Sequence, residues 1–147
     1  MKRLIHLLIL AFISTTSHAQ TSPDDLVKTF FAEYEKDAAK AVQGIYDTNP
    51  WTSRIKDAIE KVKQEVNSYT EDYVGKYYGY ESITRKQLST SFLLMSYLVK
   101  YDRQPMRFTF EWYKPNDTWM LQSFQVDVSI DDEVEEAAKV YRLDELR

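Results

Sequence analysis

Apolar residues recur every three or four positions through the first half of the chain, the spacing that places them on one face of an α-helix. Ser22 and Pro23 suit an N-cap and a first helical position, so the pattern predicts a helix over 23–46. Asn49-Pro50 breaks this pattern, because the residue before a proline is pushed out of helical conformation. A second stripe predicts a helix over 51–72. The two stripes comprise Val27, Phe30, Phe31, Tyr34, Ala38, Ala41, Val42 and Ile45, and then Ile55, Ala58, Ile59, Val62, Val66, Tyr69 and Tyr73.

From Val74 onward the apolar period changes to two and the residues become aromatic and β-branched, which indicates β-strands. Short polar links that contain proline separate the later strands, as expected for hairpins in an antiparallel meander. The segment 131–147 has acids first and basic residues later, which predicts a short C-terminal helix. The expected fold class is therefore α+β, with two N-terminal helices packed on a curved antiparallel β-meander of about four strands. The predicted strands are Tyr77–Leu88, Phe92–Tyr101, Met106–Tyr113 and Trp119–Ile130.

The last predicted strand cannot keep one apolar face by strict alternation. Trp119 and Leu121 are odd-numbered, whereas the apolar positions from Phe124 to Ile130 are even-numbered. A β-bulge near Gln122-Ser123 would restore the register and bend the strand. We therefore expect a long, curved sheet whose hollow side the two helices fill.

The first segment of the chain, MKRLIHLLILAFISTTSHAQ, has the organisation of a secretory signal peptide. Basic Lys2 and Arg3 precede an apolar run from Leu4 to Ile13, and Ser17-His18-Ala19 is a small-x-small cleavage site. This run is far shorter than the roughly 20 residues that a membrane-spanning helix needs, and no later segment approaches that length. We expect cleavage near Ala19-Gln20, a signal peptide over 1–19, one domain over 20–147, and a periplasmic or secreted protein without a membrane span.

Cleavage would also change the charge and the chemistry of the chain. Lys2 and Arg3 would be lost, so that 19 basic residues become 17 against 23 acidic ones, a net charge of −6. Such a chain, with its basic residues scattered singly, is a poor candidate for binding nucleic acid. Both histidines, His6 and His18, lie in the signal peptide and the chain has no cysteine, which excludes Ser-His-Asp and Cys-His catalysis and histidine-ligated metal sites in the mature chain. We expect no cofactor and no metal site.

Aromatic residues are concentrated in FTFEWYKPNDTWMLQSFQV, Phe108 to Val126. Tyrosine and tryptophan rings could form a stacking platform for a sugar, because they offer apolar contact and a polar handle together. Cross-strand aromatic pairing and filling of a core is the alternative, and we favour it. Glu111 and Asp127 fall on the predicted polar face of the sheet, where a solvated role is favoured over catalysis. The candidate platform comprises Tyr69, Tyr73, Tyr77, Tyr78, Tyr80, Trp112, Tyr113 and Trp119.

Two long helices followed by a curved antiparallel sheet, whose last strand reads WMLQSFQVDV, resemble the nuclear transport factor 2-like superfamily with its cystatin-like α+β cone. The segments GYESITRKQL and SYLVKYDRQPMRFTFEWYKPNDTWMLQSF are similar to those of small exported proteins of unknown function associated with Bacteroidetes. The resemblance covers roughly residues 26–130. It implies a conical cavity between helices and sheet, and assigns no catalytic residue in this chain. The residues expected to line the cavity are Tyr34, Tyr73, Tyr97, Phe108, Phe110, Trp112 and Trp119.

The fold alone does not settle the function, because this cavity is an active site in some members of the superfamily and a core or binding pocket in others. Our first hypothesis is a non-enzymatic exported binding or assembly module of the cell envelope, with an unknown small-molecule or protein partner. The second is a metal-free lyase or isomerase with an Asp or Glu base and a Tyr donor, which requires a carboxylate inside the cavity. A cystatin-type protease inhibitor is the least favoured, because the Gln-x-Val-x-Gly loop is absent. The superfamily's sheets often pair through their open faces, and Phe92–Tyr101 is apolar on both faces, so a homodimer through the sheet is a further expectation. A monomer whose C-terminal helix covers the second face would fit this pattern equally well.

Overall fold

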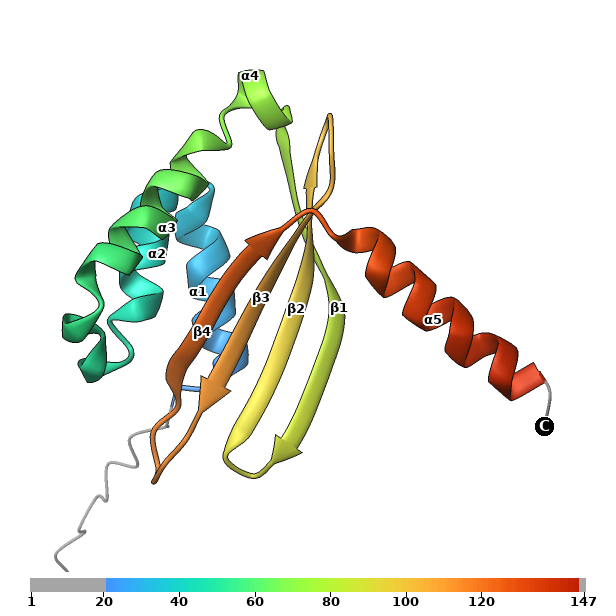
Figure 1. The fold of residues 1–147 in the computed structure, drawn as a ribbon. Coiled ribbons are helices and arrows are strands. Elements are labelled where there is room, and N and C mark those ends of the chain that lie inside the picture. The colour runs from blue at the N-terminus through green and yellow to red at the C-terminus, as the bar shows by residue number, and fades with distance from the viewer. Residues whose placement is uncertain (1–20, 146–147) are drawn as a thin grey trace, which may run out of the picture.

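The computed structural model describes the backbone of residues 21–145 and the side chains of residues 21–139. Helices come first, a four-stranded antiparallel sheet follows and one helix ends the chain, which confirms the predicted α+β layout (Figure 1). The predicted signal peptide and its cleavage site lie outside the described residues. The elements are α1 (Pro23–Tyr34), α2 (Ala38–Tyr46), the 3₁₀ helix η1 (Pro50–Arg54), α3 (Lys56–Ser68), α4 (Glu71–Val74), β1 (Tyr77–Ser89), β2 (Phe92–Tyr101), β3 (Met106–Tyr113), β4 (Met120–Asp127) and α5 (Ile130–Glu145).

The helix predicted over 23–46 is two helices, α1 and α2, separated by a turn. The backbone N–H groups of Lys36 and Asp37 both donate to the Glu33 carbonyl, at 2.9 and 2.8 Å, which closes α1. Asp37 then caps α2, since its carboxylate accepts the N–H of Lys40 at 2.9 Å. This break corrects the prediction of one continuous helix, and it lets α2 fold back beside α1.

The helix predicted over 51–72 is likewise divided, into η1, α3 and α4. Asn49 caps η1 by accepting the N–H of Trp51 at 3.0 Å, and the non-helical backbone of Ile55 separates η1 from α3. Gly75 ends α4 at a φ of 89°, a left-handed conformation that favours glycine. A Cβ built at Gly75 would lie 2.5 Å from the Cβ of Asp102, so the chain passes too closely here for any side chain.

The strands pair in the order β1-β2-β3-β4, and every pair is antiparallel. The predicted β-bulge in the last strand is confirmed: Glu111 pairs with Ser123 and Trp112 pairs with Leu121, so Gln122 has no partner on β3. β1 has three further register shifts against β2. Bulges bend a strand and increase its twist, and the sheet accordingly twists beside the helices (Figure 1).

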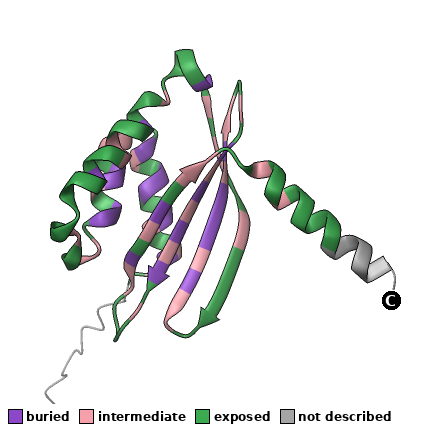
Figure 2. Ribbon diagram, in the orientation of Figure 1, coloured by how far each residue is buried: buried purple, intermediate pink, exposed green. Residues whose placement is uncertain are grey.

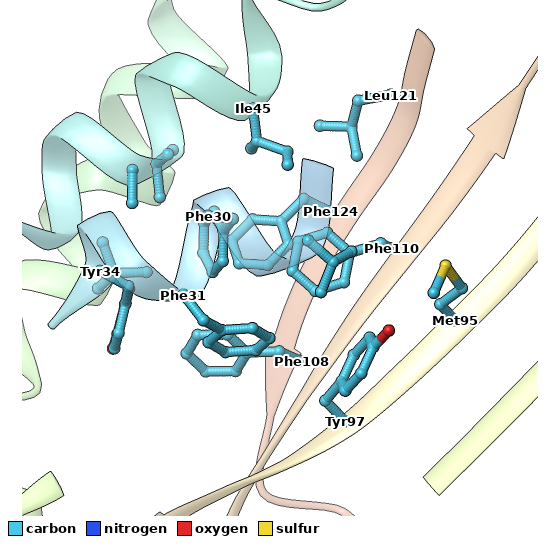
Figure 3. Packing of buried hydrophobic residues seen from close by; sticks show 14 of the residues in the cluster. Phe30, Phe31, Tyr34, Ile45, Met95, Tyr97, Phe108, Phe110, Leu121 and Phe124 are labelled. Atoms are coloured by element: carbon cyan, nitrogen blue, oxygen red, sulfur yellow. The ribbon is translucent and has the colours of Figure 1, made fainter. Parts of the chain in front are cut away.

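α1, α2 and α3 lie on one side of the sheet, and the buried residues gather between these two layers (Figures 1 and 2). The ring centroid of Phe30 lies 5.1 Å from that of Phe110 and 5.3 Å from that of Phe124. Phe31 stacks on Tyr80, with centroids 3.7 Å apart. Aromatic rings from both layers therefore meet face to face or edge to face in the interior (Figure 3). The largest fully buried side chains are Trp112, Phe31, Phe108, Phe110, Leu93, Met95, Met106, Leu121, Val27, Val42, Val66 and Val74.

α5 leaves the end of β4 and projects away from both layers (Figure 1). Val134, on its predicted apolar side, is 62% exposed. The face of the sheet opposite α1–α3 thus carries no helical layer in the part of the chain that the structure describes. Neither α5 nor any other described helix has the length and apolarity needed to cross a membrane.

Replacing Phe110 by alanine should lower the free energy of unfolding by about 3–5 kcal/mol, because it removes a fully buried ring and leaves a cavity beside Phe30 and Phe124. Thr109→Ala, one position along β3 and on the opposite face, is the matched control and should cost less than about 1 kcal/mol. Urea unfolding of each variant, followed by circular dichroism, measures both changes. Equal losses in the free energy of unfolding for the two variants would contradict a core confined to the inner face of the sheet.

Candidate functional site

Five of the seven predicted cavity-lining residues lie together in the interior. Tyr34 from α1 belongs to one buried cluster with Tyr97, Phe108, Phe110 and Trp112 from β2 and β3. The three residues from β3 have no exposed surface, and the two tyrosines expose 7% and 8% of theirs. Ring centroids of neighbours in this set are 5.3 Å apart for Tyr34 and Phe108, and 6.0 Å apart for Tyr97 and Phe110. Tyr34, Tyr97, Phe108 and Phe110 pack between α1 and the sheet (Figure 3), and Trp112 stacks beside Phe110 with ring centroids 6.3 Å apart.

The other two predicted residues lie elsewhere. Tyr73 belongs to the short helix α4 and is 64% exposed. Trp119 precedes β4 and packs, half-buried, at the margin of the core, with the Lys114 ammonium 5.1 Å from its ring centroid. The structure therefore does not bring Tyr73 and Trp119 to the interior cluster.

The polar groups of the interior include tyrosine hydroxyls and the Trp112 indole N–H, which is buried without a hydrogen-bond partner among the described residues. The hydroxyls of Tyr34 and Tyr101 form a hydrogen bond at 2.7 Å. Burial raises the pKa of Tyr34 far above its ordinary value, and burial raises the pKa of Tyr97 to about 12. Ser96 is the one buried polar or charged residue in the described part of the chain, and it pairs with Thr109 on the outer face. Within the described residues the interior thus holds protonated hydroxyls but no carboxylate that could act as a base.

The described structure has an aromatic groove on its surface that we did not predict. The groove has a volume of about 350 Å³ and lies between η1 and the β3–β4 hairpin. Trp51 is 61% exposed on the η1 side, and Tyr113 is 40% exposed on the hairpin side. The lining residues are Tyr46, Asn49, Trp51, Thr52, Ile55, Tyr113, Pro115, Met120, Leu121 and Gln122. No signal in the sequence sets Trp51 apart, because it lies four residues before Ile55 and so continues the apolar stripe of its predicted helix.

Two side chains hold η1 against the edge of the sheet. Asn49 donates its amide to the Leu121 carbonyl at 2.8 Å, and Leu121 donates its N–H to the Thr48 hydroxyl at 3.0 Å. We call this pair of hydrogen bonds the Thr48–Asn49 clasp. Both backbone groups of Leu121 face the edge of β4, where no further strand supplies partners in the described structure. The clasp therefore satisfies them and sets the separation of the two walls of the groove.

The groove is electrostatically neutral, because none of its lining residues carries a charge. Three other surface pockets each combine lysine with acidic residues, such as Lys56 with Glu60, Lys40 with Glu33, and Lys28 with Glu35. A positive charge stands at the rim, where the Arg54 guanidinium lies 4.8 Å from the ring centroid of Trp51. A neutral ligand with apolar faces suits this groove better than an ion does.

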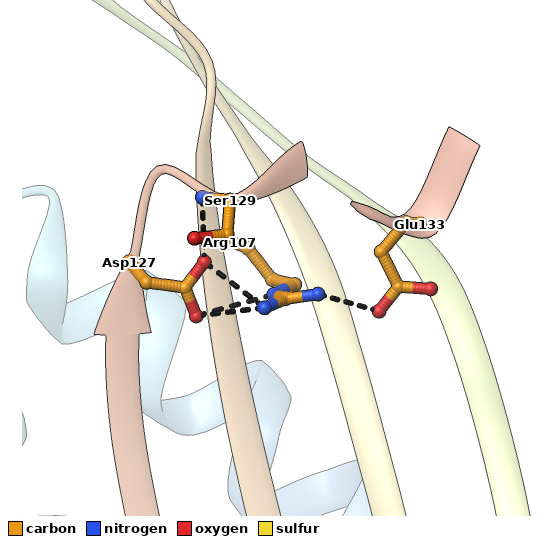
Figure 4. A network of polar contacts seen from close by, with 4 residues as sticks. All are labelled: Arg107, Asp127, Ser129 and Glu133. Carbon is orange, nitrogen blue, oxygen red and sulfur yellow. Dashed lines mark hydrogen bonds and ion pairs between the residues drawn. The ribbon is translucent and has the colours of Figure 1, made fainter. Parts of the chain in front are cut away.

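A second polar arrangement, on the outer face, joins α5 to the sheet (Figure 4). Arg107 donates through Nε and Nη2 to Asp127 at 3.2 and 3.1 Å, and through Nη1 to Glu133 at 2.8 Å. Asp127 also accepts the backbone N–H of Ser129 at 2.8 Å. Asp127 is thus engaged in an ion pair that orients the start of α5, on the polar face where the sequence places it.

The folded protein should lose stability as the pH rises above about 10, the ordinary pKa of tyrosine in an unfolded chain. Tyr34 and Tyr97 keep their protons to higher pH when folded, so the folded state then binds more protons than the unfolded state. The stabilisation that the shifted pKa values of these tyrosines contribute is complete below pH 10 and falls towards pH 12.

Urea unfolding between about pH 8 and pH 11.5, with tyrosinate absorbance recorded in parallel, measures this loss. Tyr97→Phe should make the decline shallower, since it removes one of the shifted groups. A free energy of unfolding that stays constant over this range would contradict the shifted pKa values.

Comparisons of the chain with family models, with curated proteins and with solved structures find no match. The resemblance to the nuclear transport factor 2-like superfamily consequently remains a prediction from the sequence. The candidate site is defined by its own geometry: a packed aromatic interior, an open sheet face and a neutral aromatic groove.

Proposed function

We propose that this chain is an exported, non-enzymatic binding or assembly module of the cell envelope. The observation that carries the proposal is the packed interior, where aromatic rings from α1 and the sheet are in mutual contact. No buried Asp or Glu accompanies them among the described residues. A domain built in this way offers its surfaces, rather than its interior, to a partner.

The alternative of a lyase or isomerase gains no support from this interior. That chemistry requires a base held inside an apolar pocket beside a proton donor. A tyrosine and a carboxylate do meet where Tyr69 donates to Glu65 at 2.9 Å, but this pair lies at the exposed surface of α3. The Glu65 carboxylate is solvated, and burial raises the pKa of Tyr69 above its ordinary value.

The outer face of the sheet supports the assembly part of the proposal. Phe92, Leu94 and Leu98 alternate along β2 on this face, and all three are partly exposed. Charged residues of opposite sign flank two of them: Leu94 pairs with Lys86 on β1 and Glu111 on β3, and Leu98 pairs with Glu81 and Arg107. In a two-fold arrangement, an apolar centre with both signs of charge around it is self-complementary. We therefore assign a second copy of the chain to this face.

Native and denaturing mass spectrometry of the protein purified from its own periplasm tests the proposal. We expect a mature chain that begins near Gln20 and a dimer in the native spectrum. Leu94→Lys should convert the dimer to a monomer, because it places like charges at the centre of the paired faces. Gln64→Lys, an exposed site on α3, adds the same charge on the helical side and should leave the dimer intact.

Each part of the proposal can fail separately. A wild-type protein that stays monomeric at about 50 μM would contradict pairing through the sheet, since stable interfaces of this kind hold at far lower concentration. Turnover of a co-purified compound would contradict a non-enzymatic role. A mass that includes residues 1–19 would contradict export by signal-peptide cleavage.

A further inference from the structure

We infer that the groove between η1 and the β3–β4 hairpin binds a neutral saccharide by stacking sugar rings on Trp51 and Tyr113. The inference rests on the proposed binding function and names a ligand class for it. A sugar ring has apolar C–H faces and hydroxyl groups around its edge. The groove offers a surface that complements both.

Its aromatic walls are the first reason. Large apolar side chains that are exposed singly are ordinary on protein surfaces, but Trp51, Ile55 and Tyr113 are exposed together around one groove. Rigid aromatic side chains bind ligands at a low cost in conformational entropy. Tyr46 and Leu121, which are buried, form the floor beneath them.

The polar groups of the groove are the second reason. Asn49, Thr52 and Gln122 contribute amide and hydroxyl groups, which donate to and accept from sugar hydroxyls. Gln122 is the bulged residue of β4, and a bulge re-aims the side chain that it carries. No lining residue is charged, and the Arg54 guanidinium stands only at the rim, so the lining favours a neutral sugar over a uronic acid, a phosphate or an amine.

The Thr48–Asn49 clasp is the third reason, because it excludes the usual way in which a peptide would bind here. An extended peptide gains affinity by adding a strand to a free sheet edge. At the groove, the N–H and carbonyl of Leu121 are already bonded to Thr48 and Asn49. The edge cannot pair with a peptide at this point, whereas a sugar ring needs only the aromatic faces and side-chain polar groups.

Isothermal titration calorimetry of the mature protein with cellohexaose, laminarihexaose, maltohexaose and mannohexaose tests the inference. We expect at least one of the four to bind with a Kd below about 1 mM. Trp51→Ala and Tyr113→Ala should each weaken that binding about tenfold or more, because each removes one stacking surface. Tyr113→Phe keeps the ring and should stay within about threefold of the wild type.

Tyr78→Ala is the matched control, since Tyr78 is 57% exposed and lies outside the groove. The affinity of this variant for the sugar should equal that of the wild type. Circular dichroism of every variant checks that the fold is retained. Absence of binding by all four sugars, binding that Trp51→Ala leaves unchanged, or a hydrophobic peptide recovered in the groove would each overturn the inference. The proposed function is tested separately, by mass spectrometry and by turnover of a co-purified compound, so the two results are separable.

Discussion

The structure depends on two adjacent phenylalanines of α1 being buried at once. Neighbouring residues on a helix point about 100° apart, so the two rings reach different parts of the sheet. Here Phe30 lies against Phe110 and Phe124 of β3 and β4, while Phe31 stacks on Tyr80 of β1. α1 therefore sits in a hollow and contacts strands from both edges of the sheet. A hollow of this kind requires a bent sheet, which the bulges in β1 and β4 supply.

The same packing is the reason that we propose binding surfaces on the outside of the molecule. The two rings that α1 carries into the hollow contact aromatic side chains of the sheet and fill the space around them. Tyr34, which could have supplied a polar handle there, is instead bonded to Tyr101. The open face of the sheet and the neutral groove at its β4 edge are the surfaces to which we assign assembly and binding.

The sequence predicted the parts of this structure that local patterns encode. The strands follow from period-two alternation, and the bulge at Gln122 follows from the change of parity between Leu121 and Phe124. The break between α1 and α2 also had a local signal, because Asp37 is a good N-cap, but the apolar stripe runs through the break and concealed it. In contrast, nothing local relates Trp51 to Tyr113. Their proximity depends on the clasp, whose hydrogen bonds join residues far apart in the chain.

The two edges of the sheet are protected in different ways, and this bears on how the protein could assemble. An unprotected edge strand pairs readily with other chains. The β4 edge is closed at its start by the clasp, which binds both backbone groups of Leu121. The β1 edge is interrupted by three register shifts and carries Arg85 and Lys86 side by side, features that disfavour strand addition. Because strand addition is disfavoured at β1 and at the start of β4, the partly apolar outer face around Leu94 is the surface of the sheet to which we assign a second copy.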